Sequence, residues 1–450
     1  MRQHRLFLAV LISSAAMVSL SAVARPAAGA ETDYAAWAYA GASADTGVKP
    51  AAPKATKPQR PYVDSEEGSR AVSPATPTPR PVAPARTPEA AAASQTAIPP
   101  EAMAGSYGAA TGPATAVPNM IGDSYDGSIG GFGGMKFTSS SLGISEASVG
   151  LAGGSRRFKI AEDESPIPTD RVIFDYNHFQ NPLVDINGTT RNLDRFTFGL
   201  EKTFGDGLWS LEFRVPFATD YNSTQSTVGG PLSATEFGDM ALVARRALIS
   251  REHFVLAAGL GMVFPTGPDW KITDATGTVV NVWNEAVHLD PFVGAAWCPG
   301  DRLFFLFFAQ LDFDTHGDTV LARSMGGTLD KVDVFHEQNL VMLDFNMGYW
   351  LYRNPCACRL TGIAPIVEVH YTSTLQDMDS VTVAYPYPYP FTIGPPTGTT
   401  GRRDILDLTA GIHFQIGSCS TFRVAAVVPL TTGENREFDC EVLAQFNRWF

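Results

Sequence analysis

From Asp170 onward the chain consists of segments, each about ten residues long, in which apolar and polar side chains alternate. A period of two is the period of a β-strand, in which every second side chain lies on the same face. In the segment 404–416, for example, Leu406, Leu408 and Ile412 share one face, whereas Asp407 and His413 share the other. One face of each predicted strand therefore requires an apolar neighbour, and the opposite face requires water or polar partners.

The alternation predicts about twelve strands, each about as long as a tilted strand that crosses a bilayer. Their approximate ranges are 170–179, 194–204, 208–217, 237–248, 253–264, 288–297, 302–312, 339–352, 362–373, 404–416, 420–430 and 436–450. The pattern favours an all-β chain that forms a transmembrane, antiparallel, up-and-down β-barrel. A disordered arm rich in Pro and Ala is expected to precede it.

A soluble β-sandwich would also alternate, so the lengths of the connections decide between the two folds. After every second strand the connection is short, as in "GDG", "ISRE" and "CPGD". The other connections are long, as in 265–287 and 374–403. Short turns at one rim and long loops at the other are typical of outer-membrane barrels, with the short turns in the periplasm.

The residues before Asp170 divide into three parts. Residues 1–30 have the order of a secretory signal peptide, with Arg2 and Arg5, an apolar run and small residues up to Ala30, where we expect cleavage. The alternative is a retained membrane anchor. Residues 31–121 form the Pro/Ala-rich arm, interpreted either as a solvated linker or as a tether to the cell wall or a periplasmic partner. Residues 122–169 form a Gly-rich lead-in, a plug or a linker, and the barrel occupies 170–450.

Charge and aromatic residues constrain the partners. The formal net charge is -13 and no block of basic residues is present, which argues against nucleic acid as a partner. No later stretch offers 18 uninterrupted apolar residues, so strands are expected to cross the membrane, with outer-membrane lipid as their partner. Aromatic residues at the short-turn ends are expected at the headgroup level; they are Trp209, Trp297, Trp350, Tyr352 and Trp449.

The end of the chain, "FDCEVLAQFNRWF", resembles the C-terminal signature of Gram-negative outer-membrane barrel proteins. The resemblance implies that Trp449 and Phe450 act as an assembly signal for the barrel-assembly machinery. The stretch "FGDMALVARRALI", followed by "FVLAAGLGMVFPTG", resembles a hairpin of a transporter-like barrel family linked to the meta pathway of phenol degradation. That resemblance implies movement of small, often hydrophobic compounds, and it supplies no catalytic motif. The stretch "RRFKIAEDESPIPTDRVIFDYNHF" resembles a recurrent lead-in to such barrels, and no role is assigned to it.

Charged residues on the inward faces are the candidate functional residues. They include Glu212, Arg214, Asp239, Arg245, Asp344, Glu368, His370, Asp407 and His413. Because acidic residues exceed basic ones, the functional interpretation is a water-containing lumen that favours cations. The alternative is a ladder of ion pairs that fills a closed barrel. Glu212, Arg214 and Asp239 are expected to lie close together on adjacent strands.

The segment "RLFFLFFAQL" breaks the alternation, so one apolar set must face inward. That set is expected either to contact a hydrophobic permeant or to pack against residues 130–165 folded inside the barrel. Cys298, Cys356, Cys358 and Cys419 all fall in short turns, where one or two disulfides are plausible outside the cytoplasm. The "CAC" sequence has no His nearby, so no metal is expected.

The sequence therefore favours a passive channel or transporter-like conduit for small solutes. The alternative is a structural outer-membrane anchor whose arm contacts the cell wall. His370 and His413 are expected to project inward, but no Ser is fixed beside them, so we expect no catalytic residues and no cofactor.

Overall fold

The computed structural model describes residues 117–123, 135–150, 157–395 and 398–450. All of the described residues belong to one compact unit. The predicted signal peptide and nearly all of the predicted arm lie outside the described residues. Among the residues that the structure describes, no helix has the length and apolar character needed to cross a membrane.

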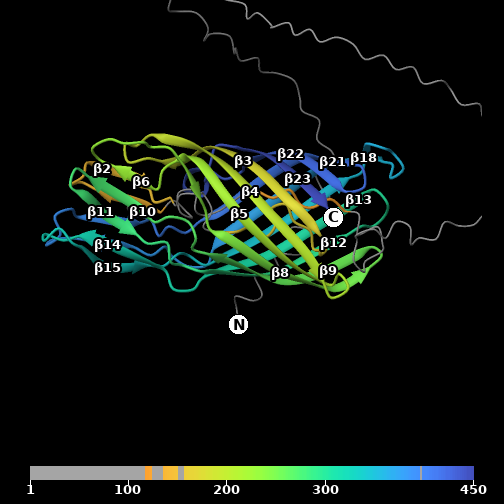
Figure 1. Cartoon of the computed structure of the whole chain (residues 1–450), viewed down its shortest axis with the longest axis horizontal. Helices are drawn as coiled ribbons and strands as arrows, with labels where there is room; N and C mark the ends of the chain where they lie inside the picture. Colours follow the sequence, from red (N-terminus) through yellow and green to blue (C-terminus); the bar gives the residue numbers. More distant parts are fainter. Residues whose placement is uncertain (1–116, 124–134, 151–156, 396–397) are drawn as a thin grey trace, which may run out of the picture. The chain divides into compact units, whose positions relative to one another are not determined.

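The predicted antiparallel β-barrel is confirmed (Figure 1). A sheet of 14 strands contains twelve long strands that pair with their sequence neighbours and close into a ring, plus the short strands β7 and β17. The ring closes where β23 pairs antiparallel with β3. Its strands are β3 (Arg171–Val184), β4 (Thr190–Phe204), β5 (Trp209–Tyr221), β8 (Met240–Arg251), β9 (Phe254–Phe264), β12 (His288–Trp297), β13 (Leu303–Asp314), β16 (Leu340–Tyr349), β18 (Leu360–Thr374), β21 (Asp404–Ile416), β22 (Ser420–Pro429) and β23 (Glu441–Trp449).

One connection differs from the prediction. The first long loop is reduced to residues 185–189, because β3 and β4 extend as a hairpin beyond the predicted strand ends. Asp185 stabilises this turn by accepting hydrogen bonds from the backbone N–H groups of Asn187 and Thr189, at 2.8 and 3.0 Å. Arg191 also donates to the Asp185 carboxylate. Local turn chemistry therefore lengthens this hairpin.

The long connections carry short strands that form a separate structure, here called the cap, beyond the long-loop rim (Figure 1). One cap sheet has five strands, which are β6 (Thr224–Ser226), β10 (Trp270–Asp274), β11 (Gly277–Val282), β14 (Asp318–Arg323) and β15 (Leu329–Phe335). The other has four strands, which are β1 (Lys136–Ser139), β2 (Ile144–Ser148), β19 (Val381–Val383) and β20 (Phe391–Gly394). The remaining elements are β7 (Ala234–Phe237), β17 (Tyr352–Arg353) and the 3₁₀ helix η4 (Gly433–Asn435).

The two faces of the ring strands differ in chemistry. Large apolar side chains are exposed on the outer face, including Val172, Phe198, Leu200, Phe213, Val293, Phe345, Val367, Ile412, Val424, Val442 and Phe446. The alternate positions of the same strands are buried and largely polar or charged. An apolar exterior around a polar interior is the reverse of a soluble barrel and matches a surface in contact with hydrocarbon.

The predicted rim aromatics divide into two groups. Trp209, Trp297 and Tyr352 are exposed at the short-turn rim. Trp350 was expected at the headgroup level, and that prediction is wrong, because its side chain is only 3% exposed. Its neighbour Tyr349 faces outward, so Trp350 turns into the lumen, where its ring lies 6.1 Å from that of Phe304.

The inner apolar set of β13 consists of Phe304, Leu306 and Phe308, all of them buried. Glycines on neighbouring strands make room for the rings. A Cβ atom at Gly348 would lie 2.1 Å from the Phe304 ring, and one at Gly294 would lie 2.5 Å from the Phe308 ring. These side chains share one buried cluster with apolar residues of the lead-in, including Phe158, Ile160 and Ile167. The inner apolar side chains of β13 therefore pack against the lead-in.

Candidate functional site

Two stretches of the chain lie inside the ring, residues 117–123 and 157–169, and together they are called the plug. They are joined by an antiparallel bridge between Met120 and Glu164. Val117 lies beside Trp350 and Trp449 at the short-turn mouth of the lumen. The hairpin β1–β2, which lies between the two stretches in sequence, is part of the cap. Residues 117–123 therefore extend into the lumen from the short-turn mouth. Residues 157–169, here called the returning stretch, lead from the cap side of the lumen to the short-turn mouth, where β3 begins.

The basic end of the returning stretch binds acidic residues near the cap. The guanidinium of Arg157 donates to Glu337 at 2.8 Å and to the backbone carbonyl of Gln338 at 2.7 Å. It also lies 3.4 Å from Asp312. Arg157 and Asp312 are fully buried. Because a buried charge is tolerated only when it is paired, these contacts hold the stretch at a defined height in the lumen.

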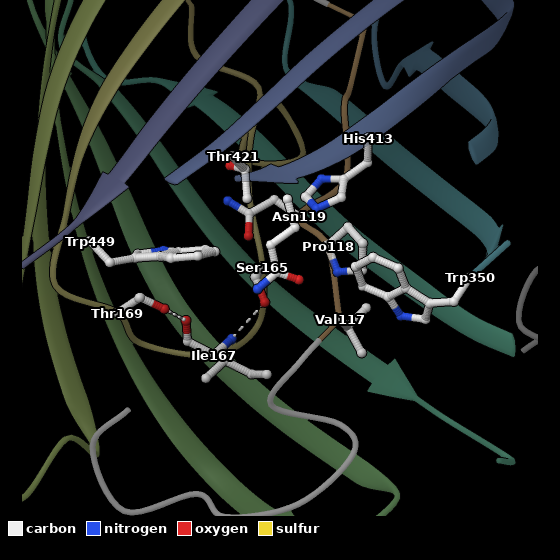
Figure 2. Close-up of a pocket in the computed structure, with 11 residues that line it drawn as sticks. Val117, Pro118, Asn119, Ser165, Ile167, Thr169, Trp350, His413, Thr421 and Trp449 are labelled. Atoms are coloured by element: carbon white, nitrogen blue, oxygen red, sulfur yellow. Dashed lines mark hydrogen bonds between the residues drawn. The ribbon is translucent and has the colours of Figure 1, made fainter. Parts of the chain in front are cut away.

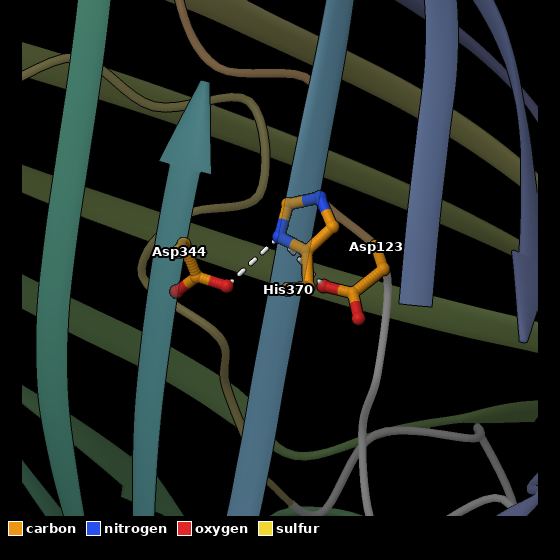
Figure 3. Close-up of side chains that lie close together, drawn as sticks. All are labelled: Asp123, Asp344 and His370. Carbon is orange, nitrogen blue, oxygen red and sulfur yellow. Dashed lines mark hydrogen bonds and ion pairs between the residues drawn. The ribbon is translucent and has the colours of Figure 1, made fainter. Parts of the chain in front are cut away.

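Lys159 lies in the middle of the lumen between two carboxylates. Its Nζ is 2.5 Å from Asp123, which belongs to the plug, and 3.0 Å from Asp344 on β16. His370 on β18 faces the same two carboxylates, with its Nδ1 at 2.8 Å from Asp344 and 3.4 Å from Asp123 (Figure 3). Asp123, Asp344 and His370 are close enough together to hold a metal ion. The ammonium group of Lys159 already supplies the positive charge there.

The acidic end of the same stretch binds basic residues toward the short-turn mouth. Glu164 lies between Arg171 and Arg245, at 2.7 and 2.5 Å. Asp163 is paired with Arg423 and accepts hydrogen bonds from Asn447. The plug cations Arg157 and Lys159 thus meet wall carboxylates, and the plug anions Asp163 and Glu164 meet wall arginines, although Glu201 and Glu212 on the wall also lie close to Glu164.

Wall side chains also bind the plug through its main chain. Gln310 accepts from the N–H of Ile160 at 2.8 Å and donates to the carbonyl of Phe158 at 2.7 Å. Glu368 accepts from the consecutive N–H groups of Ile121 and Gly122, at 2.8 and 2.7 Å. The bonds to Gln310 use only the main chain of the plug. The bonds to Glu368 require a turn at Gly122, which has a left-handed φ of 83° and where a Cβ atom would lie 2.6 Å from the Cα of Glu162.

The structure buries all nine candidate lumen residues, at 2% exposure or less. Glu212 and Arg214 are paired with each other, and Arg245 lies 3.6 Å from Glu212. Asp239 does not join them as expected. Its carboxylate instead accepts from the N–H groups of Thr266 and Gly267, because its position on the strand places it at the loop that follows β9.

Asp407 and His413 on β21 are the remaining predicted residues. Asp407 lies directly opposite His370 in the strand register, and its two carboxylate oxygens accept no hydrogen bond. His413 packs edge-on against Trp350 with ring centroids 5.6 Å apart. His413 lines a small pocket of about 30 Å³ together with Ser165, Ile167 and Trp449 (Figure 2). This volume holds one or two water molecules.

The predicted disulfides are not formed in the structure. Cys356 and Cys358 are exposed thiols on the turn after β17, and Cys419 is a free thiol on the turn before β22. Cys298 is buried at a third turn, where it belongs to the apolar cluster of the lumen. The four thiols thus lie on three turns at the same rim, and Cys356 and Cys358 share one of them.

The sequence interpretation missed the plug residues that bind the wall. Arg157, Lys159, Asp163 and Glu164 all lie in "RRFKIAEDE", a run that changes from basic to acidic. That change of sign, next to strands with inward charges, was the available signal.

Comparison with solved structures finds bacterial outer-membrane barrels. An outer membrane channel from Pseudomonas putida F1 matches with a TM-score of 0.42 and 11% identity, covering 64% of this chain and 97% of that chain. The toluene transporter TodX of Pseudomonas putida matches with a TM-score of 0.32 and 9% identity, covering 62% of this chain and 87% of that chain. No protein-family profile and no curated protein matches. At such TM-scores, the function has to be argued from the geometry of this chain.

Proposed function

We propose that the protein is an outer-membrane conduit for small solutes that is closed in this structure by its own plug. The supporting observation is the charged inner wall behind an apolar exterior. A barrel that served only as an anchor would be as stable with an apolar interior, because desolvating ion pairs costs about as much as their attraction returns. A wall of charges has a use when water and solutes replace the plug.

The location and the partners follow from the same proposal. The barrel spans the outer membrane of a Gram-negative-type bacterium after cleavage of the signal peptide near Ala30, and the barrel-assembly machinery recognises Trp449 and Phe450. We propose transport rather than catalysis. The link to phenol degradation remains a prediction, carried by the resemblance of residues 236–267. The structural anchor, with an arm bound to the cell wall, is the competing function.

Planar-bilayer conductance of the full-length, detergent-folded protein tests the proposal. The substitution Glu164→Lys removes a carboxylate paired with Arg171, Arg214 and Arg245 and adds a cation beside them. Glu201 and Glu212 lie nearby but are already paired with these arginines, so the added repulsion should drive the plug from its position. We expect brief, rare openings in the wild type and at least tenfold more open time in the variant. The current should be carried preferentially by cations, as measured by the reversal potential in a KCl gradient.

Asp330→Lys is the matched control, since it makes the same change at an exposed position on β15 in the cap. Heat-modifiable gel mobility shows that each variant is folded. A folded Glu164→Lys variant without current, together with binding of residues 31–119 to cell wall, would establish the anchor instead.

A further inference from the structure

We infer that the permeant is a short, extended peptide with basic side chains, and that the plug stretch from Arg157 to Ile160 occupies its binding site. The inference rests on the conduit function proposed above and specifies the class of solute. It starts from what the wall would present if the returning stretch moved away.

The wall contains two cation sites along one line. Asp312, Glu337 and the carbonyl of Gln338 surround the guanidinium of Arg157. Asp344 binds the ammonium of Lys159, with His370 beside it. Because the two plug residues are separated by one residue in an extended stretch, the sites are spaced for the side chains of a peptide with basic residues at alternate positions.

Between the two cation sites the wall binds a peptide backbone. Gln310 pairs with the carbonyl of Phe158 and with the N–H of Ile160, which are the main-chain groups on either side of Lys159. Such a pair recognises any extended peptide in the same place. A simple inorganic cation would use the carboxylates but not the Gln310 amide, whose acceptor and donor match the N–H and carbonyl of a peptide backbone.

The second cation site has more acceptors than Lys159 uses. Asp344 has one oxygen without a hydrogen bond, and the carboxyl group of Asp407 lies against that of Asp123 in the plug, although Asp344 and Asp407 are 1% exposed. Asp344, His370 and Asp407 lie side by side on β16, β18 and β21. A guanidinium offers five N–H donors where an ammonium offers three, so this row suits an arginine side chain at least as well as a lysine.

The plug can be exchanged for such a peptide because a peptide offers the same polar contacts, and its apolar side chains can take the places of Phe158 and Ile160 in the buried cluster. The orientation of the bound peptide in the lumen is also defined. The returning stretch runs from the cap toward the short-turn mouth, so a permeant bound in the same way has its basic residues toward the cap.

Binding and current are measured on the full-length variant Arg157→Ala/Lys159→Ala, in which the plug no longer fills the cation sites. The probe is acetyl-Arg-Phe-Lys-Ile-amide, and the control is acetyl-Glu-Phe-Glu-Ile-amide. Calorimetry in detergent should detect binding of the basic peptide alone, and in planar bilayers that peptide should reduce the KCl current. Adding Asp344→Asn should weaken its affinity by about tenfold or more, because a charge-assisted bond is lost. Adding Asp330→Asn in the cap should not change the affinity for the basic peptide.

The outcomes separate the inference from the function on which it rests. Current in KCl with equal effects of the two peptides, or with no peptide binding, overturns the inference and leaves the conduit intact. No current from this variant or from Glu164→Lys, when both are folded by heat-modifiable mobility, overturns the conduit itself. If the double variant does not fold, Lys159→Ala alone is measured in the same way with the same criteria.

Discussion

The lumen and the cap each hold part of the chain that precedes the first barrel strand, but they hold it by different means. In the lumen the plug is bound by ion pairs and by side chains that pair with its backbone. In the cap, β1 pairs with β20 through the backbone, and Phe137 is buried between Trp270 and Phe391, with ring centroids 5.5 and 5.3 Å away. The same region of sequence thus meets two chemistries within one molecule.

The difference indicates which part can move. Removing β1–β2 from the cap would expose an apolar cluster to water, and nothing in solution replaces those contacts. Removing the plug exposes a few apolar side chains, such as Phe158 and Ile160, but most of the contacts it breaks are polar ones that water, ions or a peptide can re-form one at a time. The hairpin is therefore the fixed attachment and the plug is the mobile part, and three measurements can break or sharpen this distinction.

The largest effect is expected from Phe137→Ala. This side chain is fully buried, so the cavity it leaves should lower the free energy of opening of β1–β2 by about 3–5 kcal/mol. Hydrogen exchange followed by mass spectrometry measures that opening. Tyr385→Ala is the matched control, because Tyr385 is 85% exposed in the same region of the cap. Unchanged protection of residues 136–148 would contradict the apolar attachment.

An intermediate effect is expected from Glu368→Gln. The substitution removes the charge from the acceptor of the Ile121 and Gly122 N–H groups, which should cost about 1.5–3 kcal/mol in the lumen. Hydrogen exchange should increase in residues 117–123 and stay constant in β1–β2. Asp333→Asn, at an exposed position of β15, serves as the control. Equal loss of protection in plug and hairpin would mean that they open as one unit.

The smallest effect is expected when the pH is lowered, and it is confined to the cap. Burial alone would raise the pKa of Asp274, but hydrogen bonds from Thr276, Arg323 and Tyr389 outweigh it and hold the pKa below its usual range. A lowered folded-state pKa stabilises the cap above the unfolded value of about 4, and this stabilisation is lost as the pH falls below it.

We therefore expect Asp274→Asn to lower the free energy of unfolding of the cap by roughly 1 kcal/mol at pH 7. The stability of the cap in the variant should no longer fall as the pH is lowered. Pepsin cleavage within residues 270–282, compared between wild type and variant at each pH from 2.5 to 4.5, measures this. If lowering the pH increases pepsin cleavage of the variant as much as that of the wild type, Asp274 is not responsible for the acid dependence.

The ring of strands could be predicted from the sequence because its signal is local. Alternation along β21 or β22 fixes which side chains face lipid without any knowledge of their neighbours. The cap could not be predicted in this way, since strands such as β6 and β19 have three residues each and depend on partners far along the chain. Trp350 shows the same limit at a single residue, because its position was clear and its direction depended on where β16 ends.

The sequence predicted the wall residues of the candidate site but not the plug residues that bind them. Inward charges such as Glu368 and Asp344 follow from strand periodicity. The partners Asp123 and Lys159 lie in stretches without a regular period, so only the three-dimensional fold brings them to the wall. Asp239 was misplaced for a related reason, since its height along the strand depends on register with β9.

The path of the plug has a consequence for biogenesis. Both stretches are enclosed by a ring whose final seam joins β3 to β23, and β23 is the last strand to leave the ribosome. Threading a folded hairpin through a finished pore would require the pore to widen. If the two stretches take their positions before β3 and β23 pair, no widening is required, so we expect the seam to close after the plug is in place.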